Sequence, residues 1–391
     1  MKYFSYLLIT IFITINNPLF SYCQSNNENI CLKFKNYVKF NNSRINVKLK
    51  DIIIDKFSNK YLLLNEYKKE NKNLIIKKLD KNNVLIWENT IKNIEGINIL
   101  KNSKNEIYIT SYYTKSLKLE INNKKIEIKS NHTKSLLILT LDTQTGKIIN
   151  YLNISTNYGV EPYISKINKE NNLYITGYYG GKSDFFEKKG FEDGFLLVLD
   201  SNLKKLWSKS INRKYSVIIN DIKIGINNIY LRTNKKKLYK IDKKNKEIIE
   251  ILKTANIKSF DIDKNENIYA VTHNDYLKKF DKKGNLILTN NLNDFDYIVT
   301  PSEIKVENNS LFIKYFAKIE YRNNIIISKY NLELKNIWHN AILGSSSFNG
   351  YLKIFNKNIY LFGDYDGDLK LSDKISFYNL YISNFLFEFK E

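Results

Sequence analysis

Short apolar runs centred on an aromatic residue recur along the chain, and each follows a turn rich in Asn, Lys and Asp. The seven aromatic residues are Tyr61, Tyr108, Tyr174, Tyr230, Tyr269, Phe312 and Tyr360. The intervals between them run from 39 to 66 residues, which is the length of one four-stranded propeller blade with its loops. The pattern therefore predicts seven copies of one supersecondary unit.

The other strands of each unit are predicted from the same alternation of apolar runs and turns. A first strand precedes each aromatic strand, as at residues 52–54 and 260–262, and an Asn-rich hairpin turn separates the two. In six repeats the third strand ends on a residue that can hydrogen-bond its own downstream backbone and start a turn: Asp80, Asp142, Asp200, Asp242, Asp281 and Asn331. A fourth strand follows in these repeats, and all three Trp of the chain fall at or near it.

The seventh repeat stops at its third strand, residues 385–389, so it needs a strand from elsewhere. Residues 37–49 are unassigned and are expected to complete this last blade, which would remove exposed sheet edges. No Pro-, Gly- or Ser-rich linker interrupts the repeats. The prediction is an all-β fold, a seven-bladed β-propeller closed by an N-terminal strand, formed by residues 24–391 as one domain. Its blades are expected at about residues 51–92, 97–154, 160–212, 217–252, 257–292, 301–343 and 350–391.

The first 23 residues have the pattern of a cleaved secretory signal peptide. Lys2 precedes an apolar run at residues 3–15, and a polar exit follows. The run is shorter than the ~20 residues that a membrane span needs. We therefore expect export to the periplasm, the envelope surface or the medium, with no transmembrane span in the mature chain.

Cys23 occupies the position at which a bacterial lipoprotein carries its lipidated cysteine. Lipidation of Cys23, which would tether the protein to a membrane, and ordinary cleavage around residues 22–24 both remain open. The only other cysteine is Cys31, so a disulfide between the two would constrain only the N-terminal tail. Stability must come from a hydrophobic core.

The formal net charge of +22 has two possible origins. Only four of the 62 basic residues are Arg, and the Lys residues are scattered over predicted strand faces and turns. Sites that grip phosphate or bases favour the forked guanidinium of Arg, and the abundance of Asn, Ile and Tyr is typical of an AT-rich genome. Compositional bias and a functional basic face stay as alternatives. We do not expect specific nucleic-acid binding. We do expect a weak, salt-sensitive attraction to acidic polymers, because the net charge is high.

Two segments carry a resemblance to known propeller families. Residues 172–179, 190–200 and 206–207 resemble the bacterial seven-bladed propeller repeat known as SBBP, and the last repeat is similar to it. This resemblance implies an exported propeller with no general activity attached to it. Residues 141–147 are also similar to the blade motif of quinoprotein-like propellers. That group includes pyrroloquinoline-quinone dehydrogenases and the scaffold lipoprotein of the outer-membrane assembly machinery.

The dehydrogenase branch of that resemblance would imply a disulfide between neighbouring cysteines and acidic metal ligands. The two cysteines here are eight residues apart and N-terminal, which disfavours this branch and leaves the scaffold branch. We expect no cofactor.

Other candidate chemistry is sparse. Asp364, Asp366 and Asp368 alternate as in a calcium loop, but the EF-hand spacing is broken, so a solvated loop is favoured over a metal site. The histidines, His132, His273 and His339, lie in different repeats without ligand spacing. Neither a nucleophile elbow nor a Gly-rich phosphate loop occurs. We expect no catalytic or metal-binding residues.

The long excursions between the second and third strands of repeats two, three and seven are the predicted interaction surface, because equivalent propeller loops emerge on one face. Their tyrosines suit contact with protein or glycan: Tyr112, Tyr113, Tyr178, Tyr179 and Tyr365. The alternative is that these tyrosines flank the strands and pack the blades.

The sequence thus favours an exported, monomeric, non-catalytic binding or scaffolding protein of the cell envelope. The alternative is a propeller-type lyase or hydrolase with charged residues in the central channel, where first strands would carry the chemistry. Several carboxylates or histidines meeting there would favour the enzyme.

Overall fold

The computed structural model describes residues 23–24, 33–40, 46–69, 71–129, 133–186, 192–211, 216–252, 256–292, 299–319, 322–342, 347–372 and 375–390. These residues form strands and turns but no helix, and the strands make seven sheets. The chain divides into two compact units, residues 50–292 and residues 1–49 with 293–391. Within the described residues, no helix is long and apolar enough to cross a membrane.

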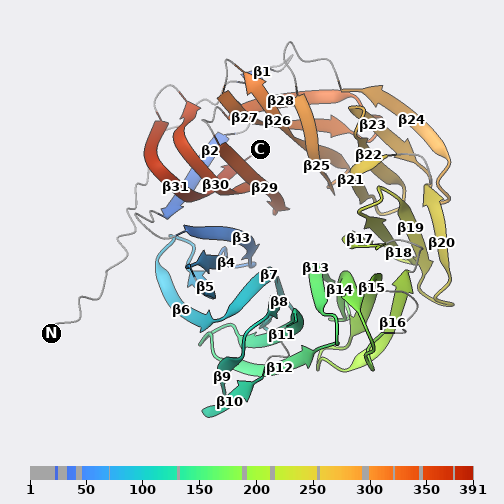
Figure 1. Ribbon diagram of the computed structural model, residues 1–391. Helices are drawn as coiled ribbons and strands as arrows, with labels where there is room; N and C mark the ends of the chain where they lie inside the picture. Colours follow the sequence, from blue (N-terminus) through green and yellow to red (C-terminus); the bar gives the residue numbers. More distant parts are fainter. Residues whose placement is uncertain are drawn as a thin grey trace. The chain divides into compact units, whose positions relative to one another are not determined.

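Five sheets lie in residues 50–292, apart from the first four residues of β3, and they follow one another in chain order (Figure 1). Four of them are simple up-and-down sheets of four strands: β3 (Asn46–Ile54), β4 (Lys60–Tyr67), β5 (Lys72–Leu79) and β6 (Leu85–Lys92); β13 (Val160–Ile167), β14 (Leu173–Gly180), β15 (Glu192–Leu199) and β16 (Lys205–Ile211); β17 (Ile219–Ile224), β18 (Asn228–Thr233), β19 (Leu238–Asp242) and β20 (Ile248–Leu252); and β21 (Ile257–Ile262), β22 (Ile268–Thr272), β23 (Tyr276–Phe280) and β24 (Leu286–Asn291).

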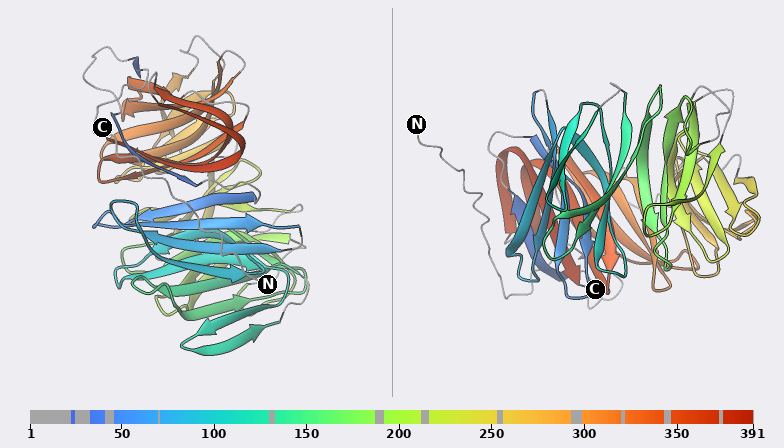
Figure 2. Two further views of the ribbon diagram at one scale, coloured as in Figure 1. Left: turned by 90° about the vertical axis from the view of Figure 1, so that its left-hand side faces the viewer. Right: turned by 90° about the horizontal axis from the view of Figure 1, so that it is seen from below.

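The second sheet of this unit has six strands, in the order β10-β9-β12-β11-β8-β7. Its strands are β7 (Ile94–Lys101), β8 (Glu106–Tyr113), β9 (Leu117–Ile121), β10 (Lys124–Ile128), β11 (Ser135–Asp142) and β12 (Ile148–Ile154). The hairpin β9–β10 is the excursion between the second and third strands of repeat two. Figure 1 and the left view of Figure 2 show it at the outer edge of its sheet, beyond β12. The predicted excursion is therefore an ordered hairpin.

The other unit holds the sixth and seventh sheets. The strands of the sixth are β25 (Val299–Glu307), β26 (Ser310–Ile319), β27 (Arg322–Asn331) and β28 (Asn336–Ile342), with the short β1 (Cys23–Gln24) at the edge. The seventh contains β29 (Ser347–Phe355), β30 (Asn358–Ser372), β31 (Ile375–Lys390) and, from the N-terminus, β2 (Lys33–Phe40). Seven blade-like sheets confirm the predicted fold class, an all-β seven-bladed propeller.

The last blade is completed by an N-terminal strand, as predicted. β2 pairs antiparallel with β31, from Lys33 opposite Lys390 to Phe40 opposite Asn384. The predicted segment, residues 37–49, extended too far, because residues 46–49 begin β3 of the first blade. Val47 and Leu49 are buried, and the strand that contains them pairs with β4 in the first sheet.

Asp and Asn side chains close the predicted turns after the third strands. In all six repeats the Oδ1 atom accepts backbone N–H bonds from residues two and either three or four positions later. Each of these six turns also contains one residue with positive φ. In chain order these residues are Asn83, Gly146, Leu203, Lys246, Gly284 and Leu334. The sequence prediction for these turns is confirmed.

The repeated aromatic residues are core residues. All seven are at most 5% exposed, and five of the six Tyr are at most 2% exposed. The preceding turn supplies a hydroxyl partner in some repeats: Tyr61 donates to Asp55 at 3.3 Å, and Tyr269 donates to Asp263 at 3.2 Å. In another repeat the partner comes from the next blade, because Tyr230 donates to Glu266 at 3.2 Å. Burying one such side chain stabilises the fold by roughly 1.5–3 kcal/mol, so the repeated aromatics anchor each blade.

Candidate functional site

The tyrosines predicted to project from loops lie in strands instead. Tyr112 and Tyr113 end β8 and are only 8% and 1% exposed, and Tyr179, near the end of β14, is 1% exposed. Tyr178 is partly buried, and Tyr365 lies in β30 with its side chain outside the described part. The loop placement is therefore wrong for these residues, since the long apolar second strands continue through them.

Two of these tyrosines hold carboxylates at the starts of neighbouring first strands. The Tyr112 hydroxyl donates to Glu95 at 2.5 Å, and Glu95 also accepts from Tyr67 at 2.9 Å and Lys72 at 2.6 Å. Burial alone would raise the pKa of Glu95, but the hydrogen bonds from Lys72, Tyr112 and Tyr67 hold that pKa below its ordinary value. Burial raises the pKa of the Tyr112 hydroxyl, and its bond to Glu95 adds to the shift.

The same arrangement recurs one blade further on. The Tyr178 hydroxyl donates to Glu161 at 2.7 Å, and Lys134 forms an ion pair with Glu161. Lys134 also lies over the ring of Tyr112, 5.2 Å from its centroid. These contacts join the second and third blades, so the predicted alternative, in which the tyrosines pack the blades, describes Tyr112 and Tyr178.

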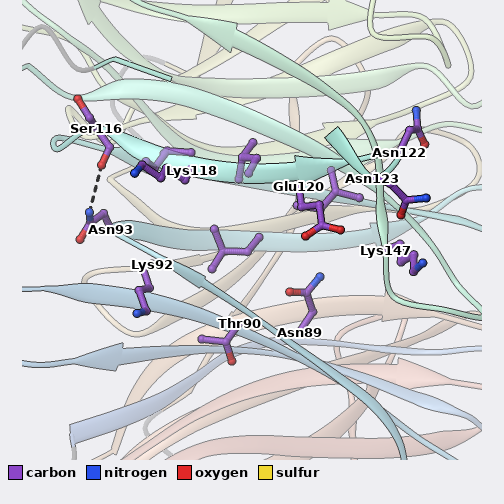
Figure 3. Close-up of a pocket in the computed structure, with 14 residues that line it drawn as sticks. Asn89, Thr90, Lys92, Asn93, Ser116, Lys118, Glu120, Asn122, Asn123 and Lys147 are labelled. Atoms are coloured by element: carbon purple, nitrogen blue, oxygen red, sulfur yellow. Dashed lines mark hydrogen bonds between the residues drawn. The ribbon is translucent and has the colours of Figure 1, made fainter. Parts of the chain in front are cut away.

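A pocket of about 560 Å³ lies between β6 and the hairpin β9–β10, which we term the β6–β9 groove (Figure 3). Its lining comes from β6, the segment into β7, the hairpin and the start of β12. The floor is apolar and buried: Ile91, Leu117, Leu119 and Ile148 are at most 5% exposed. The polar lining residues are Asn89, Thr90, Lys92, Asn93, Ser116, Lys118, Glu120, Asn122, Asn123 and Lys147.

Local sequence explains why the hairpin forms. Leu117, Leu119 and Ile121 are buried and alternate with the exposed Lys118 and Glu120, which is the period of a strand with one face covered. Ile121 pairs with Lys124 across a two-residue turn, Asn122 and Asn123, whose φ angles are 50° and 64°. Two positive φ angles define the type I′ hairpin turn, which Asn tolerates well.

Hydrogen bonds fasten both ends of the groove. Asn93 Nδ2 donates to the Ser116 carbonyl at 3.1 Å, which ties the end of β6 to the start of β9 (Figure 3). Asn89 Nδ2 donates to the Gly146 carbonyl at 2.9 Å, which ties β6 to the turn before β12. The walls are thus positioned by two blades, and amide and ammonium groups line the rim above an apolar floor. Such a surface can bind by hydrogen bonds, charge and apolar contact.

The sequence prediction missed the groove residues. The usable signal was the strict alternation at residues 117–121, followed by two Asn and a second short run at residues 124–128. That pattern predicts a hairpin inside the excursion. It does not reveal that β9 lies next to β6 of the preceding blade, because that contact depends on how two sheets pack.

The remaining candidate cysteine and histidine residues that the structure describes lie in β1, in a turn and in β28. Cys23 lies in β1 opposite Asn340, while Cys31 and His132 fall outside the described residues. His273 is exposed in a turn and His339 is in β28. Within the described part of the chain, no three metal-ligating side chains come together. The segment 364–368 is paired with β31 as part of β30, so its prediction as a loop is wrong.

First-strand carboxylates are engaged by neighbouring backbone and lysine groups. Asp51 accepts from the backbone N–H of Ile52 at 2.9 Å and of Ile99, in the next blade, at 3.1 Å. Asp261 accepts from its neighbour Ile262 at 2.9 Å and pairs with Lys223 at 3.4 Å. These bonds give the two carboxylates structural roles at their own strands.

Comparisons with known proteins support the fold. No protein-family model matches the chain. Among solved structures, the chain is similar to Chaetomium thermophilum Raptor (TM-score 0.54, 6% identity, 88% of this chain and 28% of that one). It is similar to Pyrococcus horikoshii acylaminoacyl peptidase (TM-score 0.50, 12% identity, 86% of this chain and 52% of that one). At these identities the likeness shows the propeller fold alone.

Two further similarities differ in coverage. BamB from Moraxella catarrhalis gives a TM-score of 0.49 at 11% identity, over 95% of this chain and 100% of that chain. In sequence, the chain is 26% identical over 286 residues to the MATH and LRR domain-containing protein of Plasmodium falciparum (isolate 3D7). The aligned region makes up 65% of this chain and 3% of that protein. The matched region is a very small part of the Plasmodium protein, and this identity does not show a family.

Proposed function

We propose that this protein is an exported, non-catalytic propeller that binds or scaffolds another protein at the cell envelope. The observation that carries the proposal is the β6–β9 groove. It is built by a hairpin that, among the described strands of this unit, is added to the second blade alone. Its amides and lysines, above an apolar floor, are recognition groups. Export is supported by the signal-peptide pattern of residues 1–23.

Affinity capture tests the binding role. A C-terminally tagged chain is incubated with envelope extract at low and at moderate salt, next to a Lys92→Glu/Lys118→Glu variant. Both lysines are exposed on the groove rim, so the variant should fold normally. We expect one stoichiometric protein at moderate salt with the unchanged chain and its loss with the variant.

A Lys282→Glu/Lys283→Glu variant is the matched control, because these exposed lysines lie in the turn between β23 and β24, outside the groove lining. It makes the same change in net charge and should retain the partner. Equal capture by both variants would refute the groove as the binding site. Retention of acidic material only at low salt would indicate that the charge of the chain is compositional.

Cell fractionation tests export and the role of Cys23. The full chain with a C-terminal tag is expressed in a bacterial host, and the tag is followed in cytoplasmic, membrane and periplasmic fractions. We expect the processed chain outside the cytoplasm. Incorporation of labelled palmitate that Cys23→Ser abolishes would establish lipidation, whereas unlabelled chain with an N-terminus near residues 22–24 would establish ordinary cleavage. Unprocessed cytoplasmic chain would refute export.

A further inference from the structure

Two strand edges without a full partner strand flank the β6–β9 groove. β6 is the last strand in the order β3-β4-β5-β6, so among the described strands it pairs with β5 alone. β9 pairs along its whole length with β10, but on its other side it meets β12 only where Ile121 lies opposite Ile148. Backbone N–H and C=O groups on an open edge can accept an added strand.

The groove suits a short extended segment. β6 has eight residues and β9 has five, and an extended chain rises ~3.3 Å per residue. A segment of about five residues therefore matches the length of β9. The bonds from Asn93 to Ser116 and from Asn89 to Gly146 mark the two ends of the space.

Charge and apolar surface identify the kind of segment. Lys92, Lys118 and Lys147 are exposed on the rim, and Glu120 is the only carboxylate among the lining residues. Figure 3 shows Lys118 and Glu120 on β9, and Lys92 from β6 on the other side of the space. In an extended segment alternate side chains face opposite ways, so apolar residues would meet the buried floor while acidic residues meet the lysines.

We propose that the β6–β9 groove binds an extended, acidic segment of a partner protein, which adds as a strand to the free edge of β6. This inference rests on the proposed binding function and specifies its partner chemistry. Main-chain hydrogen bonds would supply affinity, and the three rim lysines would select acidic over basic sequences.

Selection from a displayed library of random eight-residue peptides on the immobilised full chain tests the chemistry. We expect enriched peptides in which acidic and apolar residues alternate. Their affinity should fall about tenfold on the Lys92→Glu/Lys118→Glu variant and stay unchanged on the Lys282→Glu/Lys283→Glu control. Absence of enrichment, enrichment without acidic bias, or equal binding to both variants would overturn the proposal.

Backbone modification tests the binding mode. An enriched peptide is resynthesised with alternate amides N-methylated, in both phases, which keeps every side chain but removes strand hydrogen bonds. We expect one phase to lose binding and the other to retain most of it, because only one edge of the added strand faces β6. Equal binding of the unmodified peptide and both methylated forms would overturn strand addition.

The two proposals can fail separately. A partner captured through the groove whose bound segment is neither acidic nor sensitive to N-methylation would leave the binding function standing and remove this inference. Capture that is indifferent to the groove variant would remove the groove from the proposed function itself.

Discussion

Single polar side chains determine how the hairpins of this protein close. Asn102 is 4% exposed and accepts backbone N–H bonds from Lys104 and Glu106, both at 2.9 Å. Its Nδ2 donates to Glu106 at 2.6 Å and to the Tyr108 hydroxyl at 3.0 Å. One amide thus orders a turn and satisfies the aromatic residue of the adjacent strand.

Removing this amide should destabilise the protein measurably. Asn102→Ala removes four hydrogen bonds at this turn, one of them to the buried Tyr108 hydroxyl. We expect the free energy of unfolding to fall by about 2 kcal/mol. Asn102→Asp keeps the acceptor oxygens but places a second carboxylate beside Glu106, so an intermediate loss is expected. Urea unfolding followed by fluorescence measures both. Equal stability of Asn102→Ala and the unchanged chain would contradict this account of the turn.

The pKa of Glu95 leads to a prediction about pH. Its folded-state pKa lies below the ordinary value of 4.5, so its ionised form stabilises the fold above pH 4.5. That contribution is lost as pH falls through the folded-state pKa. Glu95→Gln should therefore lower the free energy of unfolding at pH 7 by about 1–2 kcal/mol, and by less as the pH drops below 4.5.

Urea unfolding at pH 7 and at acidic pH measures this difference between Glu95→Gln and the unchanged chain. Glu127→Gln, at an exposed position of β10, is the control and should change stability little. A Glu95→Gln penalty that grows on acidification would show that the hydrogen bonds from Lys72 and the tyrosines do not stabilise the carboxylate.

Strand and turn contacts between neighbouring blades hold the larger unit together. Trp87 in β6 donates through Nε1 to the Thr143 carbonyl of the second blade at 3.1 Å. The turn that contains Thr143 also contains Gly146, whose φ is +70°. A Cβ at Gly146 would lie 2.6 Å from the Trp87 ring, so the close approach of the two blades requires glycine.

Gly146→Ala should therefore loosen the contact between the first two blades. The new methyl group must displace the Trp87 ring, and the left-handed backbone conformation adds strain, so we expect a loss of about 2–3 kcal/mol. A shift in Trp fluorescence should accompany it. Gln144→Ala changes an exposed residue of the same turn and should leave both stability and fluorescence unchanged. Unaltered fluorescence in Gly146→Ala would contradict the predicted displacement.

At the scale of the whole molecule, the completed sheets matter because open edges invite association. β2 covers the edge of β31 in the seventh sheet. The chain carries a net charge of +22, which opposes self-association at low salt, but an uncovered ladder can still recruit a second chain.

Deleting β2 tests this role. A chain that begins at residue 41 lacks the strand, whereas one that begins at residue 33 keeps it. We expect the shorter chain to melt about 10 °C lower and to form dimers or larger species by edge pairing, as measured by differential scanning fluorimetry and light scattering. A monomeric short chain with an unchanged melting temperature would show that β31 does not need its partner.

The sequence by itself determined the all-β repeat, the seven strands centred on an aromatic residue and the Asp or Asn turns, because these depend on short-range periodicity and on side chains that bond their own backbone. It also indicated that the last blade needs an N-terminal strand. Tertiary structure decided that residues 33–40 supply this strand and that residues 46–49 belong to β3, since both segments alternate and only pairing partners distinguish them.

The tertiary structure also determined the groove and the positions of the tyrosines. Tyr112 looks like a loop residue in sequence, but a carboxylate from its own blade and lysines from the first and second blades surround its hydroxyl and ring. Nothing in the sequence singles out Lys92 or Lys118, and they share one groove because β6 and β9 belong to adjacent sheets. Contacts between residues distant in the chain carry no local periodic signal, which is why sequence patterns could predict the blades and not the groove between them.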